Sequence, residues 1–321
     1  MDSSNATTVV QPRTTAGHRP PATTDLKIVP LRHPLRWAGA LTLLVLVASW
    51  AWVLVTTDTF EWDLVGDYMF NSVVLDGVAN TLYITVASML IGITLGTLIA
   101  IMRLSPNPVL TTVATAYLWF FRGIPTLLQL IFWFNLASVF PRIDISAAGI
   151  TLVDVDTNTL MTPLLATLLG LGLNLAAYYS EFVRAGILSI DEGQTDAAAA
   201  YGMTRAQMLR HIILPQAMRV IIPPTGNEFI GMLKWSSLAS VISYSELLHS
   251  VQGIYNRTFE VIPLLIVASL WYLAMTTVLT IGQHFVEKRF SRGSQRTIPT
   301  ARRPRILSRL LTNVQMRRTH T

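Results

Sequence analysis

The chain has 321 residues, of which 51% are hydrophobic and only 13% charged, and its mean hydropathy is +0.47. About a quarter of the residues of a soluble domain are charged, so this composition excludes an ordinary soluble domain and indicates a protein that crosses a membrane several times. Without cysteine, the chain has no disulfides, cysteine-ligated metals or thiol catalysis. The net charge of +6 fits basic residues on the cytoplasmic side rather than nucleic-acid binding, because no aromatic and basic pattern accompanies it.

The first 57 residues predict a tail followed by a membrane helix. Residues 1–35 are rich in Thr, Pro, Ser and Ala, which predicts a disordered tail. Residues 36–57 contain an apolar run that is long enough to span a membrane and predicts an additional N-terminal transmembrane helix. A signal peptide is the alternative, but no small-x-small cleavage site follows the run before Asp58.

Five further apolar segments follow the first, at residues 78–102, 109–140, 160–183, 220–242 and 261–286. The segment 109–140 is overlong and contains Arg122, Gly123 and Pro125, which predicts a bend or a tilt. Gly92 and Gly96 favour close helix contact, although glycine is common in membrane helices for other reasons. The predicted fold is all-α: a polytopic membrane bundle of six transmembrane helices.

The charges of the connecting segments predict the orientation. Most of the 24 Lys and Arg lie in the N-terminal tail, at Arg103, in residues 184–219 and in the tail 291–321, whereas the opposite loops hold only Arg142 and Arg257. The positive-inside rule therefore places both termini and the 184–219 loop in the cytoplasm.

The longest polar interruption between apolar segments is Asp196–Pro215. Its alanine-rich start behind Asp196 predicts a short helix to Tyr201. Gly202 should break this helix, Thr204 should cap a second one, and Pro215 should prevent the second from continuing unchanged. The expected product is two helices joined by a glycine bend.

Polar residues at helical spacing within three apolar segments are candidates for a translocation path. They form three stripes: Arg122, Thr126 and Gln129; Asn174, Tyr178 and Glu181; Asn227 and Lys234. The alternative is that they join helices by hydrogen bonds. If they line a path, Arg122→Ala or Asn174→Ala should lower uptake while the protein still inserts.

No catalytic motif accompanies these features. Lys27, Lys234 and Lys288 are not followed by Ser or Thr, so the chain lacks a phosphate-binding GK[ST] loop. No HExxH metal motif or G-x-S-x-G elbow is present either. We therefore predict a non-catalytic membrane subunit without catalytic or metal-binding residues.

Five motifs in order resemble the permeases of ABC importers for polar amino acids. The polar interruption resembles the EAA loop of that family, with Asp196 where glutamate is usual; the other matches are FRGIP at 121–125, NLAAYYSEFVR at 174–184, Gly193-Gln194 before the loop, and LPQA with GNEFI at 214–217 and 226–230. Trp235 stands where the family often has aspartate or asparagine. The resemblance covers residues 70–290, the expected type I permease domain.

The resemblance implies a permease that moves a polar amino acid or related compound into the cytoplasm by alternating access, in a bacterial inner membrane. Two separate ATPase subunits would use ATP and Mg, while this chain binds no cofactor. A second permease, the same or a homologous chain, and an extracytoplasmic solute-binding protein complete the assembly. Coupling to the ATPase is expected at Asp196, Ala197, Ala198, Gly202, Leu214 and Pro215.

Two alternatives need no ATPase partner. An ion-coupled secondary transporter or channel should show intramembrane carboxylates for ions or repeated halves, which we do not find in the sequence. A membrane sensor or scaffold would work through its basic tail, whose arginines are more typical of contact with anionic membrane lipid. The particular solute and the choice between a homodimer and a heterodimer stay open.

Overall fold

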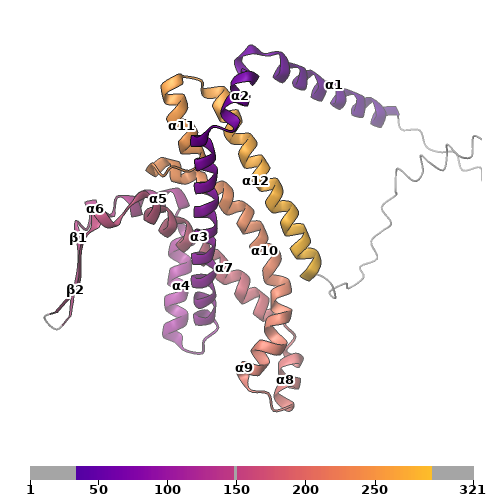
Figure 1. Cartoon of the computed structure of the whole chain (residues 1–321). Helices are drawn as coiled ribbons and strands as arrows, with labels where there is room; N and C mark the ends of the chain where they lie inside the picture. The colour runs from indigo at the N-terminus through magenta and orange to yellow at the C-terminus, as the bar shows by residue number, and fades with distance from the viewer. Residues whose placement is uncertain (1–33, 148–149, 291–321) are drawn as a thin grey trace, which may run out of the picture. The chain divides into compact units, whose positions relative to one another are not determined.

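The computed structural model describes residues 34–147 and 150–290, so the tail 291–321 and nearly all of the tail 1–35 lie outside the described residues. The chain separates into two compact units, one ending at Thr57 and one beginning at Asp58. The first unit contains the helix α1 (Pro34–Thr56), close to the predicted 36–57, and its 18-residue apolar window is fully exposed. The second unit contains all other elements in Figure 1.

The second unit is helical apart from one hairpin. In chain order its elements are η1 (Asp58–Phe60), α2 (Trp62–Met69), α3 (Ser72–Arg103), α4 (Pro108–Gly123), α5 (Thr126–Phe134), η2 (Leu136–Ser138), β1 (Arg142–Ala147), β2 (Ile150–Asp156), α6 (Thr157–Leu160), α7 (Pro163–Leu188), α8 (Glu192–Ala200), α9 (Arg205–Met208), η3 (Leu209–Ile213), α10 (Leu214–Trp235), η4 (Ser236–Ile242), α11 (Leu247–Thr258) and α12 (Val261–Phe290). The predicted all-α class is confirmed.

Helices α3 and α7 pack closely against each other at the centre of this unit. A Cβ added at Gly92 would lie 2.5 Å from the side chain of Leu175, and one at Gly96 would lie 2.8 Å from the carbonyl oxygen of Ala176. Only glycine permits these approaches, so the expectation of close helix contact at both positions is confirmed. Around this contact α3, α5, α7 and α10 share a buried apolar cluster that includes Ile84 and Leu171.

The overlong segment 109–140 contains two helices rather than one. Helix α4 ends at Gly123, α5 starts at Thr126, and their axes differ by 99°. Pro125 explains the break, because its ring and the restricted residue before it disfavour a continuing helix. The predicted bend is confirmed, but the angle is far sharper than a tilted span requires.

The number of spans differs from the expected six within residues 34–147 and 150–290. Four helices (α1, α3, α7 and α12) are long and apolar enough to cross a membrane, and a fifth span results if α4 and α5 count as one. The segment predicted at 220–242 is α10, which starts at Leu214, followed by the 3-10 turns of η4. Helix α10 carries Arg219, Glu228 and Lys234 and is less apolar. Six spans therefore stay a prediction.

The acidic segment 141–159 contains a hairpin that the sequence did not predict. Strands β1 and β2 pair antiparallel, with Arg142 opposite Asp156. The guanidinium of Arg142 forms an ion pair with Asp154 at 2.9 Å. In Figure 1 the hairpin stands away from the helices, so it is an appendage rather than part of the core.

The moderately polar segment 243–260 folds as α11, which packs against α3 and α12. Glu246 caps it: the carboxylate accepts hydrogen bonds from the backbone N–H of His249 (2.7 Å) and Leu248 (2.9 Å) and from the hydroxyl of Tyr272 (2.7 Å). Its side chain is fully buried. Burial raises the pKa of the Glu246 carboxyl, and the hydrogen bonds oppose that shift.

Candidate functional site

The segment α8–η3 holds most of the residues predicted for coupling. Helix α8 begins at Glu192 rather than at Asp196, because the side chain of Asp191 accepts the backbone N–H of Gly193 and caps the helix one turn earlier. The prediction that Asp196 starts the helix is therefore wrong. Asp196 lies within α8 with its side chain exposed, followed by Ala197 and Ala198.

The glycine bend forms as the sequence predicts. Gly202 adopts φ +74°, a left-handed conformation that glycine enters without a steric penalty. Thr204 then caps α9: its hydroxyl accepts the N–H of Gln207, and the Gln207 side chain accepts the N–H of Thr204. This reciprocal pair satisfies two free donors and holds α9 in place after the bend.

Pro215 does not end the second helix. Residues Leu209–Ile213 form a π-helical turn in which the N–H of Leu214 donates to the carbonyl of Leu209, five residues earlier. The chain continues directly into α10 with Pro215 as its second residue, so α9, η3 and α10 form one continuous helical element. The prediction that Pro215 keeps the second helix from continuing unchanged is met by the change of helix type before it.

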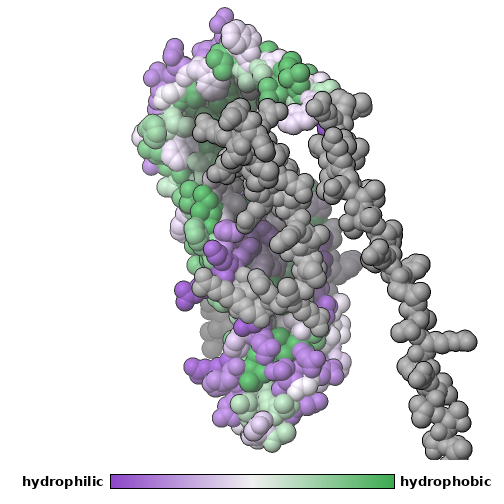
Figure 2. All heavy atoms as spheres, turned by 90° about the vertical axis from the view of Figure 1, so that its right-hand side faces the viewer, coloured by the Kyte–Doolittle hydropathy of each residue, from purple (hydrophilic) through white to green (hydrophobic). Residues whose placement is uncertain are grey.

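This segment offers an exposed surface with apolar groups. Figure 1 places α8 and α9 together at the lower end of the molecule, opposite α11. Ala198 is buried, whereas Tyr201 is 88% and Leu209 46% exposed. Figure 2 shows hydrophilic side chains gathered around the lower end of the face in view, with hydrophobic residues among them. The tip therefore presents apolar side chains among polar ones and is a candidate surface for contact with another protein.

A cluster of three arginines and one carboxylate joins α3, α4 and α7. Glu181 accepts Arg103 at 2.6 Å and Arg122 at 3.3 Å on one oxygen and Arg184 at 2.9 Å on the other. The guanidinium of Arg122 also lies 5.3 Å from the centre of the Tyr178 ring, which adds a cation–π contact. A hollow of about 480 Å³ opens beside these side chains. Two of the predicted stripes therefore meet here, with a surplus of positive charge.

Gln129 and Asn174, which also belong to these stripes, hold the break between α4 and α5. The Gln129 amide donates to the carbonyls of Phe121 (2.9 Å) and Ile124 (2.8 Å), and the Asn174 amide donates to Phe121 (2.9 Å). Both side chains are 4% exposed. Because the break frees carbonyls from helical pairing, these amides supply the missing donors. Their contacts are those of structural residues.

Gln129→Ala should destabilise the protein by about 1–3 kcal/mol, because the carbonyl of Ile124 loses its buried donor while Phe121 keeps Asn174. Thermal unfolding of the purified protein in detergent measures the effect. Asn135→Ala is the matched control, since that exposed amide bonds a carbonyl four residues back; it should change stability by less than about 0.5 kcal/mol. Equal losses in the two variants would contradict the role of Gln129.

The remaining candidates do not join the arginine cluster. Asn227 is exposed and accepts a hydrogen bond from Gln283 of α12 at 3.0 Å. Lys234 is exposed near the end of α10, and Thr126 is half-buried at the start of α5. The single cavity expected from all three stripes is therefore not formed in one chain by the described residues. Their role in transport stays a prediction.

Comparison with known proteins agrees with the resemblance in the motifs. The family described as binding-protein-dependent transport system inner membrane component matches residues 92–292. The chain is 44% identical over 274 residues, 85% of either chain, to the arginine transport system permease protein of Corynebacterium glutamicum. It is 29% identical to the histidine/lysine/arginine/ornithine transport system permease protein of Escherichia coli, covering 71% of this chain and 98% of that one.

The fold is also similar to a solved structure. A chain from the crystal structure of an amino acid ABC transporter with histidines superposes with a TM-score of 0.58 at 32% identity, over 68% of this chain and 94% of that chain. A chain of the MetNI methionine ABC transporter, with a TM-score of 0.54 and 18% identity, shares the fold.

Proposed function

This chain belongs to the family of binding-protein-dependent transport system inner membrane components, and we propose that, as a permease subunit of an amino-acid ABC importer, it moves a polar amino acid inward by alternating access. The observation that carries the proposal is the exposed α8–α9 tip with its glycine bend. The tip exposes a surface that a partner ATPase can contact. The chain itself has no phosphate-binding GK[ST] loop with which to hydrolyse ATP.

The tip is joined stiffly to the transmembrane helices. Helix α8 packs against α9 and η3, and η3 continues into α10 without a break. Small side chains at Ala197, Ala199 and Ala200 leave the outer surface of α8 open to close approach. When two ATPase subunits close on ATP and Mg, a push on α8 is passed along α10, which packs against α3, α7 and α12. Leu214 and Pro215 lie where η3 joins α10, on the route by which this push is passed on.

We propose a basic amino acid as the substrate. A relative with 44% identity is named for arginine transport, and a second is named for histidine, lysine, arginine and ornithine. An extracytoplasmic solute-binding protein would deliver the amino acid, and a second permease would complete the path. The excess of basic residues in both tails and in residues 184–219 supports a cytoplasmic position for the termini and the α8–α9 tip in a bacterium, on the side where the ATPases lie.

The test is uptake of labelled arginine by proteoliposomes that contain this permease with its ATPase and binding protein. We expect uptake only when all three components are supplied: ATP and Mg on the side of the ATPase, and the binding protein on the opposite side of the membrane. Liposomes without the ATPase, given a proton or sodium gradient, are the control. Arginine uptake in that control would refute the proposal and favour the ion-coupled alternative.

A further inference from the structure

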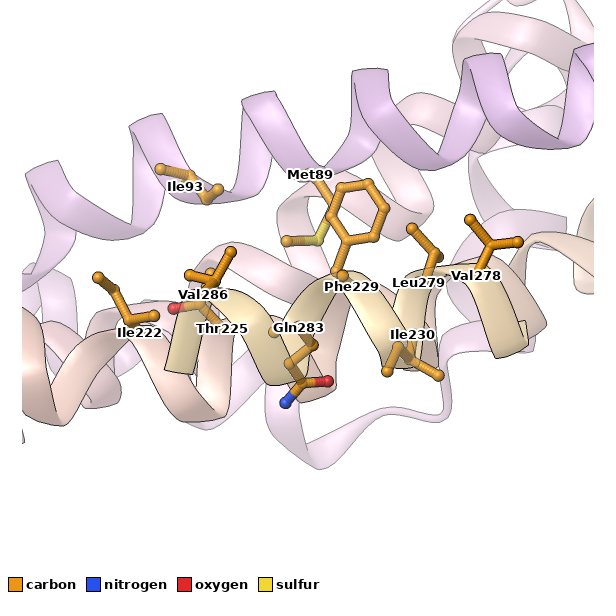
Figure 3. Close-up of a pocket in the computed structure, with 12 residues that line it drawn as sticks. Met89, Ile93, Ile222, Thr225, Phe229, Ile230, Val278, Leu279, Gln283 and Val286 are labelled. Atoms are coloured by element: carbon orange, nitrogen blue, oxygen red, sulfur yellow. The ribbon is translucent and has the colours of Figure 1, made fainter. Parts of the chain in front are cut away.

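An apolar cavity of about 520 Å³ lies between α3, α10 and α12. Figure 3 shows Met89 and Ile93 of α3 on one side and Phe229 of α10 pointing towards them, while the amide of Gln283 points away. Apolar side chains of all three helices line the cavity, among them Met89, Ile93, Ile222, Phe229, Val278 and Val286. A cavity of this size and lining is suited to a hydrocarbon chain and not to a charged amino acid.

A second hollow of about 460 Å³ lies between α10 and α12, nearer the first turns of α10 and the last turn of α12. It is lined by Arg219 and Lys288 together with Glu287. The carboxylate of Glu287 already accepts the Gln283 amide at 2.7 Å. Neither Arg219 nor Lys288 makes an ion pair with any residue in 34–147 or 150–290. The hollow therefore offers two cationic groups to an anion.

The two hollows share one pair of helices. On α10, Arg219 and Pro223 line the hollow with basic groups, and Ile222, Thr225 and Phe229 line the apolar cavity. On α12, Lys288 and Glu287 line the first, and Val286 and Val278 line the second. One turn of helix is about 5.4 Å, so the basic groups lie within two to three turns of the centre of the apolar cavity. The distance from the basic groups to the centre of the apolar cavity therefore matches the length of a phospholipid headgroup with the first part of its acyl chain.

We propose that an anionic phospholipid binds here, with an acyl chain in the apolar cavity and its phosphate at Arg219 and Lys288. Burial of methylene groups in the cavity and attraction of the phosphate to two cations act together, as for other two-part membrane anchors. A zwitterionic lipid with the same chains gains only the first contribution. Each basic group is worth about fivefold in affinity for an anionic headgroup and the Glu287 carboxylate opposes one of them, so the net preference for the anionic lipid is about fivefold.

The experiment is native mass spectrometry of the complete transporter, extracted from proteoliposomes of phosphatidylglycerol and phosphatidylcholine with identical acyl chains. We expect phosphatidylglycerol to remain bound preferentially to the permease. Arg219→Gln with Lys288→Gln should lower its retention about 25-fold relative to phosphatidylcholine. Arg257→Gln, which removes an exposed arginine of α11, is the charge control and should leave retention unchanged.

The cavity is tested separately with Gly282→Leu. Gly282 lines the cavity, and a Cβ there meets nothing within 4 Å, so a larger side chain starts in open space. The variant should lose both lipids. Gly253→Leu on α11 is the matched control, since Gly253 is equally open, and it should keep both.

Three results would overturn the proposal. Equal retention of the two lipids would mean that no headgroup is recognised, and unchanged retention in Gly282→Leu would mean that the chain lies elsewhere. Gly282→Cys, made in a chain that has no cysteine, provides the third. A disulfide between two permeases at this position would show that a second copy covers the cavity.

Discussion

Gly202→Val should lower ATP-driven uptake at least about tenfold while the permease still inserts and folds. Gly202 adopts φ +74°, which a β-branched residue enters only at a cost of about 2 kcal/mol or more. The space around it is open, so the added side chain itself makes no clash. We expect the strain to turn α8 relative to α9, because Gly202 lies in the link between them. The ATPase then meets a displaced tip, and both its co-purification and transport should fall at least about tenfold.

Gly202→Asn tests whether coupling requires the left-handed bend at this position or glycine itself. Asparagine enters the left-handed region far more readily than valine, so this variant should keep uptake within about twofold of the unchanged protein. Deletion of Ala197–Ala200 should remove coupling completely, since it removes most of the second half of α8. If Gly202→Val transports normally, the tip is not the place where the ATPase acts, and the assignment of Asp196, Ala197 and Ala198 to coupling is wrong.

The features predicted well from the sequence are those that depend on neighbouring residues. Gly202, Thr204 and Gln207 carry the information for a bend and a capped helix within six positions. The break near Pro125 was predicted from Gly123 and Pro125, which lie two residues apart. The close contact at Gly92 and Gly96 needed only the spacing of one helix turn, although its partner, α7, was visible only in the structure.

Features that depend on a choice between similar residues, or on distant residues, were missed. The start of α8 was misplaced because Asp191 competes with Asp196 as a cap, and both are plausible by residue type. The π turn before α10 goes beyond the prediction that Pro215 changes the helix, because a proline does not specify which helix type precedes it. Glu246 looked like a loop residue, and its burial shows only when Tyr272, 26 residues later, is brought to it. The stripe from Arg122 to Gln129 assumed one straight helix, which the 99° bend divides.

Glu181→Ala should destabilise the permease by about 3 kcal/mol and lower its thermal unfolding midpoint in detergent by at least about 5 °C. One carboxylate, whose side chain is 27% exposed, holds Arg103, Arg122 and Arg184. Without it, three cations from three helices repel one another where water is scarce, and no acceptor replaces the lost hydrogen bonds. Glu181→Gln keeps an oxygen but not the charge, so its loss should be intermediate.

Arg122→Ala gives the matched comparison, because it removes a cation from the same cluster without leaving a charge unpaired. Its side chain is 43% exposed and its distance to Glu181 is 3.3 Å, so stability should change by less than about 1 kcal/mol. If Arg122 belongs to the translocation path, uptake should nevertheless fall at least about tenfold, with the ATPase still bound. Normal uptake in Arg122→Ala, beside a strong loss of stability in Glu181→Ala, would leave the cluster a purely structural link between α3, α4 and α7.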